Sequence, residues 1–455
     1  MIEEHNEGEA GSGTVLVAAG EDRQLEELAR LVETLGLEVL GELEQGRRDG
    51  VGYLGRGKRA ELKELVGRVG ASFVVTDDEL SASQARVLEE AAGVTVVDRT
   101  LLIIRIFEAH ARDAASRLEV ELAELSYRLP RVRGGYRALS RLGGGGVTTR
   151  GPGEQQLEYD RRVIRRRMER IRERLAEEEA ARRVRGARLK KEGPPSVALV
   201  GYTNAGKTTI LNALSGEGRS TADRLFETLE TTTRLVTGTG GNHPNGQTAE
   251  VGGGSPTMQT GTARPDFVLT DTVGFIRKLP TQLVHSFAST LEAARDADII
   301  VLCADASSEK LEEEIRTVED TLTESLLSGV SEDGGTHDSL GDGAFGTKSR
   351  EAVLCLNKID LVSEEGRREL ASSYPEAVSI SARRDASPLL DAINGALASD
   401  RVRMRLLIPH AEYGAVNGLY GRAEIHARED TEEGLKLDVT LTKPQASRYA
   451  HYRTA

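Results

Sequence analysis

A glycine-rich loop between an apolar run and a helix-forming run constrains this chain more than any other feature. Residues 196–200 are apolar and β-leaning, and Gly201 ends the run. Gly206, Lys207 and Thr208 then open a segment whose apolar residues have helical spacing. The pattern G-x-x-x-x-G-K-T between a strand and a helix is typical of a phosphate-binding loop, because its glycines let backbone N–H groups turn inward around phosphates. An ordinary glycine-rich turn is the alternative, and the combined spacing, lysine and threonine disfavour it.

The chemistry of such a loop assigns roles to its residues. Lys207 would reach the β- and γ-phosphates of a nucleoside triphosphate, and the Thr208 hydroxyl would bind Mg²⁺. The loop alone does not indicate which base the nucleotide carries. The nucleotide-binding residues that we predict in this loop are Gly201, Tyr202, Thr203, Asn204, Ala205, Gly206, Lys207, Thr208 and Thr209.

Two later segments indicate a guanine base. An N-K-x-D motif at 357–360 follows an apolar run, and its Asp360 can accept hydrogen bonds from both guanine N1–H and the exocyclic amine. Adenine offers no such pair of donors. A second short motif, at 381–383, follows another apolar run and fits the last base-contacting loop. The base-contacting residues that we predict for GTP and GDP are Asn357, Lys358, Asp360, Ser381, Ala382 and Arg383.

A D-x-x-G motif and a threonine cluster supply the metal ligands and the switches. Asp271, Thr272, Val273 and Gly274 form this motif after an apolar run. Asp271 would hold Mg²⁺ through water, and the Gly274 N–H would contact the γ-phosphate. We take Thr232 as the Mg²⁺ ligand of the first switch, and Thr231 and Thr233 remain alternatives in the same cluster. The predicted metal ligands are Thr208, Thr232 and Asp271, and the predicted catalytic residues are Lys207, Thr232 and Gly274.

Phe275 stands directly after the glycine of the D-x-x-G motif. In Ras-like GTPases that position carries the glutamine that orients the attacking water, and a phenyl ring cannot do this. We therefore expect slow hydrolysis, or a water placed by another group or by a partner.

Several segments together resemble the HflX family of ribosome-associated GTPases, within the Obg/HflX-like class of P-loop GTPases. The resemblance rests on D-T-V-G-F-I at 271–276, on 225–234, on G-P-G-E-Q-Q-L-E at 151–158, and on 53–58 and 97–103. It covers nearly the whole chain and implies binding to the large ribosomal subunit and its RNA, with roles in ribosome splitting or rescue and some tolerance of ATP. Departures from the family pattern are Gln155, Tyr159 and the pair Glu230-Thr231.

The fold that we predict is α/β with four parts. A small parallel α/β domain at 1–103 precedes a two-helix antiparallel coiled-coil arm at 104–192. A P-loop GTPase domain at 193–400 carries low-complexity insertions at 237–265 and 328–350, and a small α+β domain follows at 401–455. In the N-terminal domain, 53–58 is interpreted as a helix-entry turn or as an RNA-backbone contact.

Apolar residues three and four apart predict the two helices of the arm. The first helix would run from Ile104 to Leu129, where Pro130 ends it, and the second from about Leu157, with a glycine-rich tip loop between them. From 161 to 192 the chain has 14 Lys or Arg and six Asp or Glu, against a net charge of −13 for the whole chain. A solvated helix face explains this basic run, and so does binding to RNA phosphates, which we favour.

Composition bounds the location and the partners. Cys303 and Cys355 lie in apolar runs without metal or disulfide spacing, which indicates a reducing cytoplasm. No signal-peptide pattern and no run of membrane-spanning length is present, so we expect no membrane span. We also expect a monomer with no DNA partner. The acidic surface suits either solubility or high salt.

These observations predict a Mg²⁺-dependent GTPase, and the family resemblance implies that it acts on the large ribosomal subunit. The alternative is a GTP-regulated RNA chaperone or remodeller that forms no stable ribosome complex.

Overall fold

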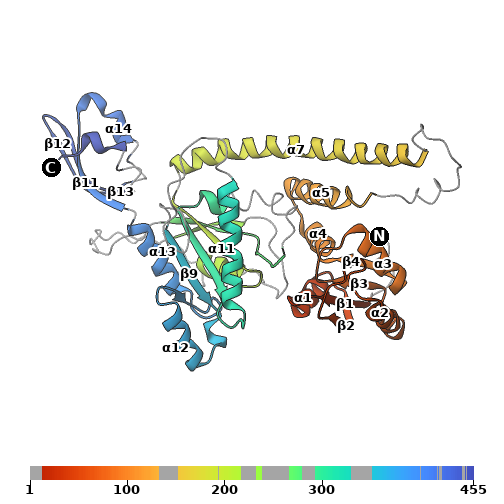
Figure 1. Ribbon diagram of the computed structural model, residues 1–455. Coiled ribbons are helices and arrows are strands. Elements are labelled where there is room, and N and C mark those ends of the chain that lie inside the picture. The colour runs from red at the N-terminus through yellow and green to blue at the C-terminus, as the bar shows by residue number, and fades with distance from the viewer. Residues whose placement is uncertain are drawn as a thin grey trace. The chain divides into compact units, whose positions relative to one another are not determined.

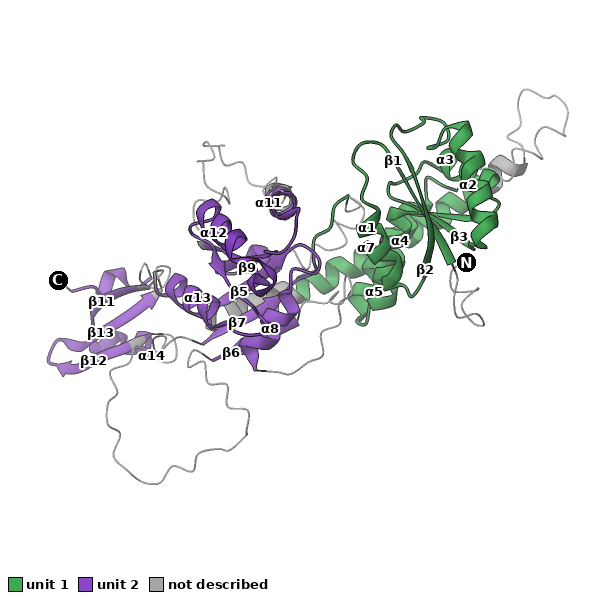
Figure 2. Ribbon diagram, turned by 90° about the horizontal axis from the view of Figure 1, so that it is seen from below, with its two compact units in different colours: residues 1–181, 222–230, 275–290 green, residues 182–221, 231–274, 291–455 purple. Residues whose placement is uncertain are grey.

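The computed structural model describes residues 13–132, 152–192, 194–216, 232–237, 266–278, 293–328, 351–399, 401–417, 419, 423–442, 446 and 448–454. The chain divides into two compact units (Figure 2). The first unit comprises 1–181, 222–230 and 275–290, and the second comprises 182–221, 231–274 and 291–455. The predicted insertions lie outside the described residues, apart from Thr237 and Ser328 at their edges. The predicted glycine-rich tip, 142–153, also lies outside them except for Pro152 and Gly153, which begin a helix.

The first unit contains a parallel sheet in the order β2-β1-β3-β4 (Figure 1). Its strands are β1 (Gly13–Ala19), β2 (Glu38–Gln45), β3 (Phe73–Thr76) and β4 (Thr95–Asp98). The helices that alternate with them are α1 (Leu25–Thr34), α2 (Arg56–Val69), α3 (Ala82–Ala92) and α4 (Arg99–His110). Every residue of β1 is buried, as expected for a strand that is covered on both faces. The predicted parallel α/β fold is confirmed, and 53–58 is the entry to α2.

The predicted first arm helix, from 104 to 129, is wrong as a single element. Helix α4 ends at His110, and α5 (Ala114–Arg128) begins anew after Asp113, whose carboxylate accepts a hydrogen bond from the Ser116 N–H at 2.6 Å. The buried Ile104 and Phe107 belong to α4, which packs against α1, β3 and β4. The first apolar positions of the predicted seam therefore serve the core of the sheet rather than a coiled coil.

A single long helix, α7 (Pro152–Glu192), forms the second stretch. Its Met168 and Ile171 are buried, and Arg167 makes a bidentate ion pair with Glu121 of α5, at 2.6 and 2.7 Å. This contact lowers the pKa of the Glu121 carboxyl below its ordinary value. Arg131, which follows α5, stacks on Tyr127 and donates to the Leu80 carbonyl, so its guanidinium is committed to the fold.

The second unit contains a six-stranded sheet in the order β10-β9-β8-β5-β7-β6, in which only β6 is antiparallel to its neighbour. Its strands are β5 (Ser196–Gly201), β6 (Thr232–Val236), β7 (Phe267–Asp271), β8 (Ile299–Asp305), β9 (Glu351–Asn357) and β10 (Val378–Ser379). Its helices are α8 (Lys207–Ser215), α11 (Leu311–Ser328), η1 (Ile359–Leu361), α12 (Glu364–Ser373) and α13 (Ser387–Ser399). The predicted nucleotide motifs all follow the carboxyl ends of parallel strands, where ligands bind in open α/β sheets.

The C-terminal segment forms a separate antiparallel sheet in the order β11-β13-β12. Its elements are β11 (Arg401–Ile408), η2 (His410–Glu412), α14 (Gly414–Asn417), β12 (Glu424–Thr431), β13 (Gly434–Thr442) and η3 (Ala450–Tyr452). Leu406, Leu437 and Val439 are buried on one face, together with Val416 of α14. This alternation of buried and exposed residues confirms the predicted α+β segment.

Candidate functional site

The phosphate loop joins β5 to α8 and is shaped by one glycine in particular. Gly206 has a φ of 88°, in the left-handed region that favours glycine. A Cβ at this position would lie 2.2 Å from the Nδ2 atom of Asn357, which is closer than any side chain tolerates. Gly206 therefore lets the loop turn against Asn357 before Lys207 begins the helix.

Lys207 is buried at the centre of this loop. Its Nζ atom donates to the backbone carbonyls of Gly201, at 3.1 Å, and Tyr202, at 2.9 Å. Burial lowers the pKa of the Lys207 ammonium, while the Asp271 carboxylate opposes that shift. A buried cation is stabilised by further negative charge, so this position suits an anionic ligand.

Thr208 and Asp271 come together from different elements. The Thr208 hydroxyl donates to the Asp271 carboxylate at 2.7 Å, and Asp271 is fully buried at the end of β7. Thr232 opens β6 and is the strand partner of Asp271 in the pairing of β6 with β7. Thr233 is exposed and shares a hydrogen bond with the Thr270 hydroxyl at 3.2 Å, while Thr231 lies outside the described residues.

Gly274 lies against the phosphate loop. A Cβ at Gly274 would lie 2.8 Å from the Cα atom of Thr203 and 3.0 Å from the Nζ atom of Lys207. The hydroxyl of the preceding Thr272 donates to the Leu199 carbonyl of β5 at 2.7 Å. The D-x-x-G motif is thus held against β5, and the backbone of Thr203 leaves no room for a side chain at Gly274.

Asn357 connects the phosphate loop to the predicted base-contacting loop. Its side-chain amide donates to the Ala205 carbonyl at 2.9 Å, and its side-chain oxygen accepts from the Ala382 N–H at 3.0 Å. Lys358 adopts a left-handed φ of 62°, and its ammonium pairs with Asp305 at 2.6 Å. Sequence reasoning missed Asp305, although an acid at the end of the apolar run 299–304 was the available signal.

Asp360 and the 381–383 loop lie beyond Asn357. The Ser381 hydroxyl, with smaller contributions from Arg384 and Arg383, holds the pKa of the Asp360 carboxyl below its ordinary value. Arg384 lies 3.5 Å from Asp360, whereas the Arg383 side chain is exposed. An ionised carboxylate accepts hydrogen bonds and donates none, which suits a ligand with two N–H donors.

Two features are absent from the residues that the structure describes. These residues contain no helix that is both long and apolar enough to cross a membrane. They also contain no group of three or more His, Cys, Asp or Glu side chains placed to hold a metal ion.

Comparisons with known proteins agree with this geometry. Models of three protein families match the chain: GTP-binding GTPase N-terminal at 22–108, GTP-binding GTPase Middle Region at 110–188, and 50S ribosome-binding GTPase at 196–330. The GTPase HflX of Caldanaerobacter subterraneus subsp. tengcongensis is 37% identical over 434 residues, which cover 94% of this chain and 90% of the relative. The GTPase HflX of Lacrimispora saccharolytica is 34% identical over 430 residues, or 92% and 91% of the two chains.

Among solved structures, a GTP-binding protein from the hyperthermophilic archaeon Sulfolobus solfataricus in complex with GDP matches 85% of this chain and 98% of its own, at 19% identity and a TM-score of 0.40.

Proposed function

The chain belongs to the HflX family of GTPases and is a GTP-hydrolysing enzyme, and from this premise we propose that it is a partner-gated switch on the large ribosomal subunit. The observation that carries the proposal is the meeting of Lys207, Gly274 and the Thr208–Asp271 pair at the carboxyl edge of one sheet. We also propose four functional parts, with the predicted boundaries at 192 and 400 and with the first boundary at His110, where α4 ends, in place of 103.

In this proposal the phosphate loop exchanges internal hydrogen bonds for phosphate contacts. The Lys207 ammonium leaves the carbonyls of Gly201 and Tyr202 for the β- and γ-phosphate oxygens, whose charge offsets its burial. The N–H groups of the loop, up to Thr208 and Thr209 at the start of α8, surround the phosphates. The Gly274 N–H contacts the γ-phosphate from the opposite side, which its closeness to Lys207 supports.

The donors at Thr208 and Asp271 fit a magnesium ion. A hydroxyl and a buried carboxylate 2.7 Å apart are the hard oxygen ligands that Mg²⁺ prefers. Thr208 would hold the ion directly and Asp271 through water, with Thr232 as the ligand from the first switch. When bound, the ion neutralises charge on the β- and γ-phosphates.

The base is read by Asp360 and the 381–383 loop. The ionised Asp360 accepts from both guanine donors, and Asn357 and Lys358 hold the loops around it through Ala205, Ala382 and Asp305. Guanine is thereby preferred over adenine. The attacking water lacks a glutamine to orient it because Phe275 stands in that position, so hydrolysis is slow until a partner places the water.

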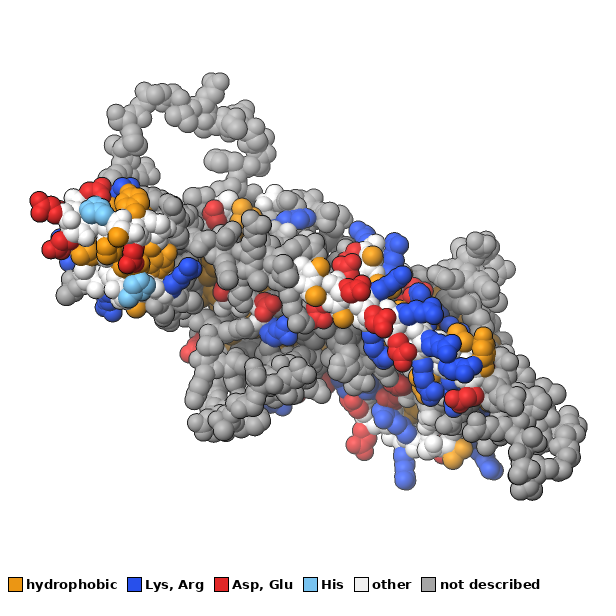
Figure 3. All heavy atoms as spheres, turned by 90° about the horizontal axis from the view of Figure 1, so that it is seen from above, with side chains coloured by type: hydrophobic (Ala, Val, Ile, Leu, Met, Phe, Trp, Pro, Cys, Tyr) orange, Lys and Arg blue, Asp and Glu red, His pale blue; other side chains and the backbone are white. Residues whose placement is uncertain are grey.

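The large subunit is the partner that the family and helix α7 support. Lys and Arg side chains gather along α7, with Asp and Glu among them, in the view of Figure 3. The exposed basic residues of the helix that the structure describes are Arg162, Arg165, Arg166, Arg167, Arg170, Arg172 and Arg174. Such a row of cations suits binding to the phosphate backbone of RNA. We also propose that the protein acts in the cytoplasm as a monomer.

The test is co-sedimentation with ribosomal subunits in GDP and in a non-hydrolysable GTP analogue, together with GTPase rates across a salt series. Replacing Arg161, Arg162, Arg165 and Arg166 with Glu should abolish binding and ribosome-stimulated hydrolysis while nucleotide affinity stays unchanged. A matched control reverses the same number of exposed charges elsewhere in the first unit, at Arg30, Lys63, Arg68 and Arg86. Wild-type binding by the α7 variant would leave α7 as a solvated helix. Binding to free RNA alone would favour the RNA chaperone instead.

A further inference from the structure

The sheet of the first unit has the strand order at which open parallel sheets form a crevice for ligands. Strand β1 lies between β2 and β3. The chain therefore passes from β1 to a neighbour on one side and then to a neighbour on the other side. In open parallel sheets the carboxyl ends of two such strands border the crevice where ligands bind. Here the crevice is bordered by Asp22, three residues after β1, and by Asp77 and Asp78, directly after β3.

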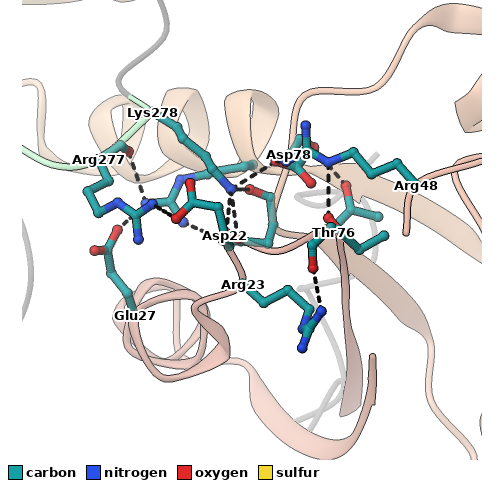
Figure 4. Close-up of polar contacts among 12 residues, drawn as sticks. Asp22, Arg23, Glu27, Arg48, Thr76, Asp78, Arg277 and Lys278 are labelled. Carbon is teal, nitrogen blue, oxygen red and sulfur yellow. Dashed lines mark hydrogen bonds and ion pairs between the residues drawn. The ribbon is translucent and has the colours of Figure 1, made fainter. Parts of the chain in front are cut away.

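A lysine from a distant part of the chain occupies this crevice. The Lys278 ammonium lies 2.9 Å from the Asp77 carboxylate and 2.8 Å from that of Asp78 (Figure 4). It also donates to the backbone carbonyl of Asp22 at 3.2 Å. The neighbouring Arg277 pairs with the Asp22 carboxylate, and its carbonyl accepts from Arg99 at 3.1 Å.

The acidic side chains are held in place by groups other than Lys278. Asp77 is 2% exposed and pairs with Arg99 at 2.7 Å, and Arg99, itself 2% exposed, also pairs with Glu27. Asp78 accepts from the Tyr53 hydroxyl at 2.9 Å and from Arg48 at 2.7 Å. The carboxylates that receive the ammonium are therefore positioned by the buried Arg99 and Tyr53 and by the more exposed Arg48.

Two backbone outliers lie at this contact. Tyr53 has a φ of 64° and Lys278 a φ of 51°, a region that non-glycine residues rarely adopt. The Tyr53 hydroxyl accepts from the Ala19 N–H at 3.1 Å and donates to Asp78, so its conformation serves the crevice directly. Strained residues of this kind persist where the surrounding contacts over-determine them.

We propose that this crevice is an ammonium-binding site of the N-terminal domain, that Lys278 is its ligand, and that its occupancy is linked to the nucleotide. Lys278 stands four residues after Gly274, the glycine assigned to the γ-phosphate. Docking of 275–278 on the crevice restricts Gly274 through the intervening peptide bonds. A nucleoside triphosphate that requires Gly274 to move must release Lys278, and by linkage the occupied crevice weakens triphosphate binding relative to GDP.

This inference rests on the nucleotide chemistry and not on the ribosomal partner, so the two fail separately. The first experiment labels amines of the purified full-length protein with an acylating reagent, and mass spectrometry compares Lys278 with the exposed Lys63. Lys278 should be protected without nucleotide and with GDP. It should label at least about 5-fold faster with a non-hydrolysable GTP analogue, the lower end of typical coupling. Labelling at the Lys63 rate in every state would overturn the proposal.

The second experiment measures affinities for the same analogue and for GDP. Lys278→Met and Asp78→Asn should each shift their ratio toward the analogue by about 5-fold or more, and the double variant should add nothing further. Lys63→Met is the control for loss of a lysine charge in the same unit, and it should leave the ratio unchanged. An unchanged ratio in Lys278→Met, or additive effects in the double variant, would refute the linkage even if Asp78→Asn proved unstable.

Discussion

The parallel strands of the two sheets end at edges with opposite chemistry. In the second unit the chain leaves β5 through a glycine-rich loop whose cation, Lys207, is held by backbone carbonyls. In the first unit the chain leaves β1 and β3 through Asp22, Asp77 and Asp78, whose carboxylates hold the cation of Lys278. One edge is suited to receive anions, and the other already holds a cation.

This difference shows that the strand arrangement sets where a ligand can bind but not the charge of the ligand. The residues that directly follow each strand set that charge. Glycine with positive φ allows backbone N–H groups to converge, as at Gly206. Buried aspartates with fixed partners instead present oxygens, as at Asp77.

The largest effect should come from removing the cation of the phosphate edge. Lys207→Ala should lower GTP affinity by at least about 100-fold, because hydrogen bonds to charged groups contribute roughly 1.5–3 kcal/mol each. Calorimetric titration with GTP measures this, and Lys310→Ala, at an exposed lysine of the same unit, is the control. Wild-type affinity in Lys207→Ala would remove the basis for the phosphate loop.

The matching change at the acidic edge is Arg99→Met. It removes the cation that the buried Asp77 shares with the partly buried Glu27. Because Asp77 keeps its ion pair with Lys278, the cost should be about 3 kcal/mol, the lower end for breaking a buried pair. Hydrogen exchange of the β1 and β3 amides reports the opening free energy of this sheet. The control is Arg105→Met in α4, which breaks ion pairs that are more exposed than those of Arg99. It should lower the opening free energy by less than about 1 kcal/mol. Equal protection in the two variants would contradict the prediction that Arg99 stabilises this sheet more than Arg105 does.

Asp360→Asn tests whether the edge of the second sheet distinguishes guanine from other bases through this carboxylate. The amide presents a donor to a guanine donor, so discrimination should fall by roughly 5- to 150-fold, which corresponds to about 1–3 kcal/mol for an unsatisfied group. Competition among GTP, ATP and xanthosine triphosphate measures it, and the xanthine base should gain. Asp385→Asn makes the same chemical change in the following loop, where Asp385 accepts from the Ser387 N–H. If both variants keep the wild-type preference, another group reads the base.

The smallest effect should come from Tyr53→Phe. Loss of the hydroxyl leaves the Ala19 N–H and Asp78 with one partner fewer. The opening free energy of the sheet, measured by hydrogen exchange of the β1 amides, should fall by about 1–2 kcal/mol. Tyr413→Phe is the control, because that hydroxyl is exposed where it accepts from Arg428. Loss of stability in Tyr413→Phe alone would reverse the expected order.

The sequence predicted the edge of the second sheet well because its motifs are local. Each follows an apolar strand by a few residues, so strand recognition and spacing place Lys207, Asp271 and Asn357 at one edge. Asp305 was missed because it belongs to no motif and acts only through Lys358. The roles given to Thr232 and to the base-contacting residues stay predictions.

The edge of the first sheet escaped prediction because its contacts are not local. Lys278 and Asp77 are separated by 201 residues, and no periodicity relates them. The break between α4 and α5 was missed for a different reason. The apolar spacing continues through Ala111, although α4 ends at His110 and Asp113 caps the start of α5. Spacing reports which face is apolar and does not report where hydrogen bonding stops.

The two hydrogen bonds of the Asn357 side chain bear on the rate of nucleotide release rather than on base selectivity. One side chain fastens the loop around the phosphates, at Ala205, to the loop beside the base, at Ala382. We therefore expect the two loops to open together when a bound nucleotide leaves. On that expectation, the rate of GDP release depends on both loops at once and not on either loop alone.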